Sequence, residues 1–147
     1  MKQQNLIKIL TDYKQFQIFI LGIFSGIPLF VIYTTLAAWM SQKGIDVAII
    51  ASFAAARIFY SLKVIWAPFV DNIKIPLLHK LGRRKSWMYI IFFIISCIMF
   101  CYNLLDPDIS ISKIFWVTIV LGFMSATLDI VIDAYRIDNI EKEQLSI

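Results

Sequence analysis

Four ionisable side chains lie inside long apolar stretches of this sequence: Arg57, Lys63, Asp129 and Asp133. A charge in such a setting needs a partner, a water-filled cavity or a route to the interface. Asp129 and Asp133 are four residues apart, so they share one face of a helix. Such a pair fits a relay of protons or cations along a pathway. It also fits a structural anchor near a membrane interface, which is the favoured interpretation for Asp133.

The depth of each charge along its helix predicts which charges can meet. If the helices begin near Val47 and Ile114, Lys63 lies ~24 Å and Asp129 ~23 Å along them, at 1.5 Å per residue. We therefore expect a Lys63–Asp129 ion pair. Arg57 lies ~15 Å along its helix, near the middle of the membrane. Its best partner is an acid of the last helix or a group on another chain, and the alternative is that Arg57 is a damaging substitution.

These charges must be positioned by membrane-spanning helices, because the chain is too apolar for one small soluble core. Sixty per cent of its 147 residues are hydrophobic, and its mean hydropathy is +0.77. A soluble domain is about half apolar and buries only part of its surface. Four apolar blocks approach or exceed the roughly 20 residues that cross a bilayer. They are Phe16–Met40, Val47–Val70, Trp87–Leu104 and Ile114–Ala134.

The predicted fold is accordingly an all-α membrane protein with four transmembrane helices in the lipid bilayer. Residues 1–15 form an N-terminal segment, 16–134 the transmembrane region and 135–147 a tail. Cys97 and Cys101 are four apart in an apolar block, and His79 is the single histidine. These residues support neither a metal site nor a cofactor. No enzymatic activity is expected.

Basic residues outside the four blocks are divided unequally between the two sides of the membrane. Ten belong to the side of the termini and two to the opposite side. Because lysine and arginine are retained in the cytoplasm, both termini are predicted to be cytoplasmic. The net charge of +4 then reflects topology, and no nucleic-acid partner is expected. The ten are Lys2, Lys8, Lys14, Lys74, Lys80, Arg83, Arg84, Lys85, Arg136 and Lys142, and the two are Lys43 and Lys113.

The first apolar block contains residues that affect helix packing. Gly22 and Gly26 form a small-x-x-x-small pair, which permits close contact with another helix. Pro28 removes a backbone donor inside the same helix and should bend it. Bent, glycine-containing helices line cavities in transporters, but simple packing is the favoured interpretation here.

Several stretches resemble AmpG-type muropeptide permeases, a family of the major facilitator superfamily. The Ser125–Arg136 string (Ser-Ala-Thr-Leu-Asp-Ile-Val-Ile-Asp-Ala-Tyr-Arg) is the most specific of them and resembles the inner half of the family's helix 4. The likeness covers about Phe16 to Glu143. The other stretches are Ser25–Pro28, Thr35–Trp39, Lys63–Asp71 and Gly82–Trp87.

The resemblance implies a bacterial inner-membrane importer that is proton-coupled and carries anhydro-muropeptides. It also implies a conformational charge cluster at the cytoplasmic end of helices 2 and 3, made by Asp71, Arg83 and Arg84. An anion is unfavourable at a helix C-terminus, so guanidinium groups would offset the cost of placing Asp71 there. The alternative is an ordinary basic cytoplasmic loop.

The sequence departs from the family pattern in three respects. Asn72 stands in place of an expected arginine, and Arg57 in place of a small residue. Four helices are predicted where the family has two six-helix halves. We therefore expect a truncated transporter, or one piece of a split transporter acting with further segments. The alternatives are a nonfunctional or structural membrane fragment and then a small four-helix drug exporter, although Phe16–Met40 lacks the acid that such exporters carry.

Overall fold

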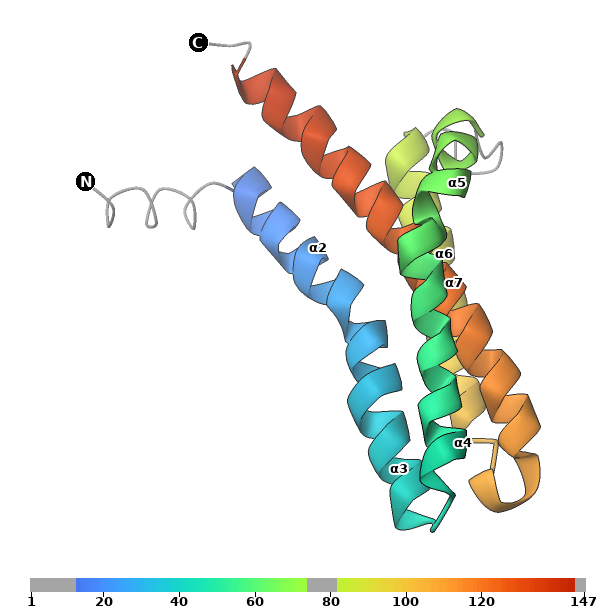
Figure 1. Cartoon of the computed structure of the whole chain (residues 1–147). Helices are drawn as coiled ribbons and strands as arrows, with labels where there is room; N and C mark the ends of the chain where they lie inside the picture. Colours follow the sequence, from blue (N-terminus) through green and yellow to red (C-terminus); the bar gives the residue numbers. More distant parts are fainter. Residues whose placement is uncertain (1–12, 74–81, 145–147) are drawn as a thin grey trace.

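The computed structural model describes residues 13–73 and 82–144, and every regular element in these ranges is helical (Figure 1). Three sets of sequence predictions lie outside the described residues: the basic N-terminal segment up to residue 12, Lys74 and Lys80 of the second connection, and the last three residues of the tail. The elements are α2 (Tyr13–Phe30), η1 (Val31–Leu36), α3 (Ala37–Gln42), α4 (Val47–Ser52), η2 (Phe53–Arg57), α5 (Ile58–Asn72), α6 (Arg83–Tyr102) and α7 (Pro107–Gln144).

The four predicted membrane spans are confirmed, because four stretches of helix are long and apolar enough to cross a bilayer. The third begins earlier than expected, at Arg83, and the fourth extends beyond the predicted Ala134. The helix of the fourth span runs on to Gln144, so the first part of the predicted tail is helical. The spans are Phe16–Gln42, Val47–Asn72, Arg83–Tyr102 and Pro107–Asp138.

The early start of α7 has a local cause. Pro107 occupies the first helical position, where its missing N–H would have had no partner. The Asp106 carboxylate accepts a hydrogen bond from the backbone N–H of Asp108 at 3.2 Å and so caps the helix. These two residues begin a short first turn of α7, which a kink at Ser110 (φ −125°, ψ 27°) separates from the rest of the helix.

The turn after α3 is built from a glycine in the left-handed region. Gly44 has φ +73°, a conformation that costs glycine little. Its N–H donates to the carbonyl of Ser41 at 3.0 Å, and the N–H of Ile45 donates to that of Met40 at 3.1 Å. This pair of bonds satisfies carbonyls at the end of the helix and reverses the chain.

The first two spans are not uniform α-helices. The π-helical η1 follows Pro28, which cannot supply an N–H to the preceding turn. The missing N–H of Pro28 would have faced the carbonyl of Phe24 in the preceding turn, whereas η1 begins after it, so the predicted bend at Pro28 stays a prediction. In the second span, the 3-10 helix η2 separates α4 from α5 and ends at Arg57.

Helix α7 is the centre of the bundle, because it packs against α2, η2, α5 and α6. Figure 1 shows it in orange and red, running the length of the molecule. Of its most apolar window, 56% is buried, against 11% for each of the first two spans. The first two spans thus present most of their apolar surface outward, as expected for helices solvated by lipid.

Gly22 and Gly26, which were predicted to permit close helix contact, make none with the described residues. A Cβ added at either glycine would meet nothing within 4 Å. The close approach occurs instead at Gly122 of α7, where an added Cβ would lie 2.9 Å from both the Cβ and the carbonyl oxygen of Ala56 in η2. The absence of a side chain at Gly122 therefore allows the two backbones to meet.

The two ends of the bundle differ in what they carry. The described chain begins and ends at the same end, where α5 ends and α6 begins (Figure 1). The short turns at 43–46 and 103–106 lie at the opposite end. We call the end where the described chain begins and ends the terminal end, and the end that carries the two short turns the turn end. An even number of spans requires this arrangement.

Candidate functional site

An ionic cluster joins α5 to α7 inside the spans. The Lys63 ammonium donates a hydrogen bond to Asp129 Oδ2, and its Nζ lies 3.7 Å from Asp133 Oδ2. The Lys63–Asp129 pair predicted from their equal depths is therefore present, and Asp133 lies beside it as a second acid. Lys63 and Asp129 are 28% and 27% exposed, whereas Asp133 is 57% exposed. Lys63 therefore has one close and one more distant carboxylate.

A neutral hydrogen bond extends this cluster towards the turn end. The hydroxyl groups of Tyr60 and Ser125 are 2.5 Å apart, and Ser125 is fully buried. On α7, Ser125, Asp129 and Asp133 are spaced by four residues and so form one polar stripe. Tyr60 and Lys63 are three apart on α5 and face that stripe. We call these five residues the polar ladder.

An aromatic cluster covers another side of the α5–α7 contact. The rings of Phe59 and Trp66 on α5 surround Phe123 on α7, with centroids 5.5 and 5.1 Å from it. The indole N–H of Trp66 donates to the hydroxyl of Thr127 at 3.2 Å. Such edge-on and tilted aromatic contacts add directional packing to apolar burial. The ladder is therefore held between helices that are also fixed by ring packing.

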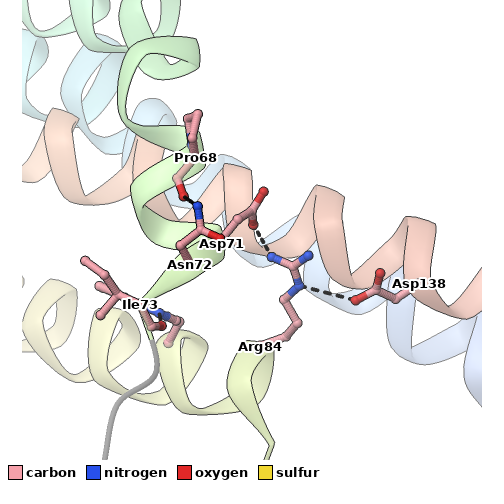
Figure 2. A network of polar contacts seen from close by, with 7 residues as sticks. Pro68, Asp71, Asn72, Ile73, Arg84 and Asp138 are labelled. Carbon is pink, nitrogen blue, oxygen red and sulfur yellow. Dashed lines mark hydrogen bonds and ion pairs between the residues drawn. The ribbon is translucent and has the colours of Figure 1, made fainter.

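A second ionic cluster lies at the terminal end and links α5, α6 and α7 through one guanidinium (Figure 2). Arg84 Nη1 donates to Asp71 Oδ1, and Arg84 Nε donates to Asp138 Oδ2 at 3.2 Å. Arg84 is the least exposed member, at 17%, against 42% for Asp71 and 49% for Asp138. The planar guanidinium can serve two acids at once, which an ammonium does less well.

The positions of Asp71 and Arg84 explain why they pair. Asp71 is in the last turn of α5, and Arg84 is in the first turn of α6. An anion at a helix C-terminus and a cation at a helix N-terminus both oppose the helix dipole. Each charge therefore compensates the unfavourable field around the other. The sequence-based expectation for Arg83 differs from the structure, since Arg83 is exposed and has no ion pair with a described residue.

Asn72, which stands where the family pattern has arginine, supports the end of α5. Its side-chain amide donates to the carbonyl of Pro68 at 2.8 Å (Figure 2). The adjacent carbonyl of Ile73 accepts a hydrogen bond from the Trp87 indole at 3.1 Å. The end of α5 is therefore tied to α6 by a neutral bond beside the Asp71–Arg84 pair.

Arg57 joins neither ionic cluster. Its guanidinium carbon lies 5.6 Å from the centroid of the Tyr33 ring in η1, within the range of a cation–π contact. The expected pairing of Arg57 with an acid of the last helix is therefore not found among the described residues. The reason is rotational: Arg57 is exposed at the end of η2, whereas Ala56 is the residue that meets α7.

A third ionic contact joins the two turns at the turn end. Lys43 Nζ lies 3.4 Å from Asp106 Oδ1 and 2.9 Å from Asp108 Oδ2. The backbone N–H of Asp108, followed by the Lys43 ammonium, lowers the pKa of Asp106. The hydrogen bonds that the Lys43 ammonium donates to Asp108 and Asp106 raise the pKa of Lys43. Because these groups are exposed, the contact orients the turns and contributes little to stability.

Sequence reasoning did not assign a role to Tyr60, Ser125, Asp138 or Gly122. The four-residue spacing of Ser125 with the two aspartates was a usable indication of the ladder. Asp138 was placed in a polar tail, and its role follows only from the continuation of α7 beyond residue 134. Gly122 has Thr118 and Ala126 four residues away on either side, a small-x-x-x-small pattern that was a usable indication of close helix packing.

Four spanning helices with ionic side chains gathered between them define a multi-pass membrane protein of the transporter class. A family model described as "Acetyl-coenzyme A transporter 1" matches residues 15–147. The chain belongs to this family, which is a transporter family of the major facilitator type. The resemblance to AmpG-type transporters is also confirmed by the curated relatives.

Two relatives indicate the range of similarity. "Putative transporter AmpG 4" of Rickettsia conorii is 47% identical over 143 residues, which cover 97% of this chain and 34% of the relative. "Anhydromuropeptide permease" of Escherichia coli K12 is 31% identical over 125 residues, which cover 85% of this chain and 25% of the relative. The chain thus spans about a third or less of the length of these relatives. No solved structure matches it.

Proposed function

We propose that this chain takes part in proton-coupled import of anhydro-muropeptides and carries the acid that couples proton and substrate movement. The observation on which this proposal rests is the ion pair of Lys63 with Asp129 inside the spans, with Asp133 one turn away. Intramembrane ionic groups are costly and are kept mainly for transport or for pairing. The printed name of the Escherichia coli relative supplies the substrate class.

The cluster supports a simple coupling step. A proton that binds the Asp129 carboxylate removes its negative charge and weakens the contact with Lys63. The ammonium remains charged and can then shift to Asp133, whose carboxylate is already 3.7 Å away. Since Lys63 is on α5 and both acids are on α7, this exchange changes the force between the two helices. Loss of the proton restores the original pair.

We further propose that the protein lies in a bacterial inner membrane with the terminal end in the cytoplasm. Arg83, Arg84, Lys85 and Arg136 all belong to the terminal end, and lysine and arginine are enriched in cytoplasmic loops. Under this orientation, the Asp71–Arg84–Asp138 cluster lies at the cytoplasmic surface. It would hold α5, α6 and α7 together in one conformation and release them in another.

Further transporter segments are proposed to cover the charged faces that this chain leaves exposed. Asp133 is 57% exposed, and Arg57 is exposed near the middle of its span. Charges in such positions normally face a protein interior or a wet cavity, because lipid solvates them poorly. The proposed substrate pathway therefore runs along the side of the bundle that carries Asp133.

A chimera tests the proposal directly. Residues 16–138 replace the matching segment of the Escherichia coli permease, and labelled anhydro-muropeptide uptake is measured in cells without their own permease. We expect uptake that is abolished by a protonophore and by Asp129→Asn. The Asp133→Asn variant should retain part of this uptake. A chimera that inserts normally but shows no uptake, or equal uptake with Asp129→Asn, would contradict the proposal.

Orientation is tested separately by cysteine labelling in intact cells. In a background with Cys97 and Cys101 replaced by alanine, Arg136→Cys should react with an impermeant maleimide only after permeabilisation. Lys113→Cys, near the turn end, should react in intact cells. The reverse pattern would place the terminal end outside the cell.

A further inference from the structure

A cavity of about 420 Å³ opens between α2, α6 and α7 near the terminal end, and none of its lining residues belongs to the two ionic clusters. Its volume lies within the ~300–1,000 Å³ typical of small-molecule sites. The lining residues of α6 are Lys85, Met88, Tyr89 and Phe92, which share one helix face by their spacing. The cavity is therefore a groove that follows the helix axis for about two turns.

Polar and apolar groups are separated along this groove. Lys85 is in the first turn of α6, and Gln17 is in the first helix near the beginning of its span. Further into the membrane, the wall is made by Ile20, Leu21, Met88 and Phe92. From Lys85 to Phe92 the helix rises ~10 Å. The groove thus has a polar mouth at the interface and an apolar interior.

The charge at the mouth is not used within the described protein. Lys85 is exposed and has no ion pair with a described residue. By contrast, the neighbouring Arg84 binds two acids on other helices. An unpaired cation over an apolar groove at a membrane interface is complementary to an amphiphile with an anionic head.

The deep end of the groove is closed by aromatic packing. The ring of Phe92 contacts that of Phe24 edge-on, with centroids 6.1 Å apart, and so links α6 to α2. This contact limits the groove to its outer two turns. The available space suits the upper part of an acyl chain more than an extended polar substrate.

We propose that this groove binds an anionic phospholipid of the leaflet at the terminal end. The phosphate of the headgroup pairs with Lys85, Gln17 provides a hydrogen bond, and the first part of one acyl chain lies against Ile20, Leu21, Met88 and Phe92. The bound lipid would fill the space between α2 and α6 and hold the first span in position. This inference does not depend on the substrate or on proton coupling.

Native mass spectrometry of the full chain in detergent tests the site with two added lipids, phosphatidylglycerol and phosphatidylcholine, at equal concentration. We expect phosphatidylglycerol to be retained about fivefold more, the size that one basic residue contributes at an anionic membrane surface. Lys85→Gln should remove that preference, and Lys85→Arg should keep it. Lys113→Gln, a neutralised exposed lysine in α7 far from the groove, is the matched control and should change nothing.

A second variant separates the groove from the charge. Ile20→Trp adds a ring to the apolar wall and should lower retention of both lipids while leaving helicity by circular dichroism unchanged. Lys85→Gln is a surface change and remains decisive if Ile20→Trp misfolds. Equal retention of the two lipids by the unmodified chain would overturn the proposal, as would equal effects of Lys85→Gln and Lys113→Gln. A lipid-free dimer would likewise overturn it and show that protein covers the groove.

Discussion

Gly122 of α7 lies against the backbone of Ala56 in η2, closely enough that an added methyl group would come within 2.9 Å of the Ala56 carbonyl oxygen. This contact sets the distance between the central helix and the second span. It lies at the point where the second span tightens into a 3-10 helix, one residue before Arg57. The proposed exchange of partners by Lys63 would take place between the same two spans, less than two turns further along.

Gly122→Ala should therefore destabilise the bundle. Because the obstacle is backbone, the helices must move apart, and overpacking of this kind costs about 1–3 kcal/mol. Thermal unfolding in detergent measures the effect. Gly22→Ala and Gly26→Ala are the controls, since both sites are open and alanine is the better helix former. Equal behaviour of the three variants would show that the close contact is absent.

Reversal of the charges of Lys63 and Asp129 should preserve insertion and most of the stability. Each single change, Lys63→Asp or Asp129→Lys, places like charges together and should be strongly destabilising. Removal of one member of a buried pair costs about 3–5 kcal/mol, and partial exposure of this pair puts the loss at or below the lower limit. Unfolding in detergent compares the three variants. A double exchange that is worse than either single change would reject the pair.

Arg84→Gln should loosen the terminal end of the bundle, whereas Arg83→Gln should have little effect. The first change leaves Asp71 and Asp138 without their shared partner, and hydrogen bonds to charged groups contribute about 1.5–3 kcal/mol each before allowance for exposure. Arg84→Lys should be intermediate, because an ammonium cannot span both acids in the same geometry. Thermal unfolding distinguishes the three. A larger loss of stability in Arg83→Gln than in Arg84→Gln would contradict the role of Arg84 as the shared partner of the two acids.

The contact between the two turns should respond to pH through Asp106. Its pKa is lowered in the folded state, so its contribution to stability is present above the ordinary value of 3.8 and is lost as pH falls through the folded pKa. The pKa of Lys43 is raised, so its contribution is present below 10.5 and is lost only as pH rises through the folded value. The contact is therefore complete throughout the physiological range.

Carboxyl-selective NMR titration measures this directly. The Asp106 midpoint should lie below its ordinary value in the unmodified chain. Lys43→Gln should raise it only in part, because the larger cause is the backbone N–H of Asp108, which remains. Full recovery of the ordinary value in Lys43→Gln would mean that the ammonium, and not the helix cap, governs this carboxylate.

The sequence alone determined the number of spans, their approximate limits and the depth of each charge. Hydropathy along the chain is a one-dimensional property, and an α-helix rises by a constant amount per residue. The level shared by Lys63 and Asp129 followed from these two facts. The resemblance carried by Ser125–Arg136 likewise identified the transporter class before any contact was known.

Only the tertiary structure decided which residues at the same depth in the membrane contact one another. It selected Arg84 rather than Arg83, added Asp138, placed Arg57 over Tyr33, and moved the close helix contact from Gly22 and Gly26 to Gly122. These outcomes depend on the rotation of each helix about its axis and on its neighbours. Lipid is as apolar as a protein interior, so hydropathy does not distinguish a lipid-facing side from a protein-facing one. Packing shape and ionic contacts make that choice, and both arise only when the helices assemble.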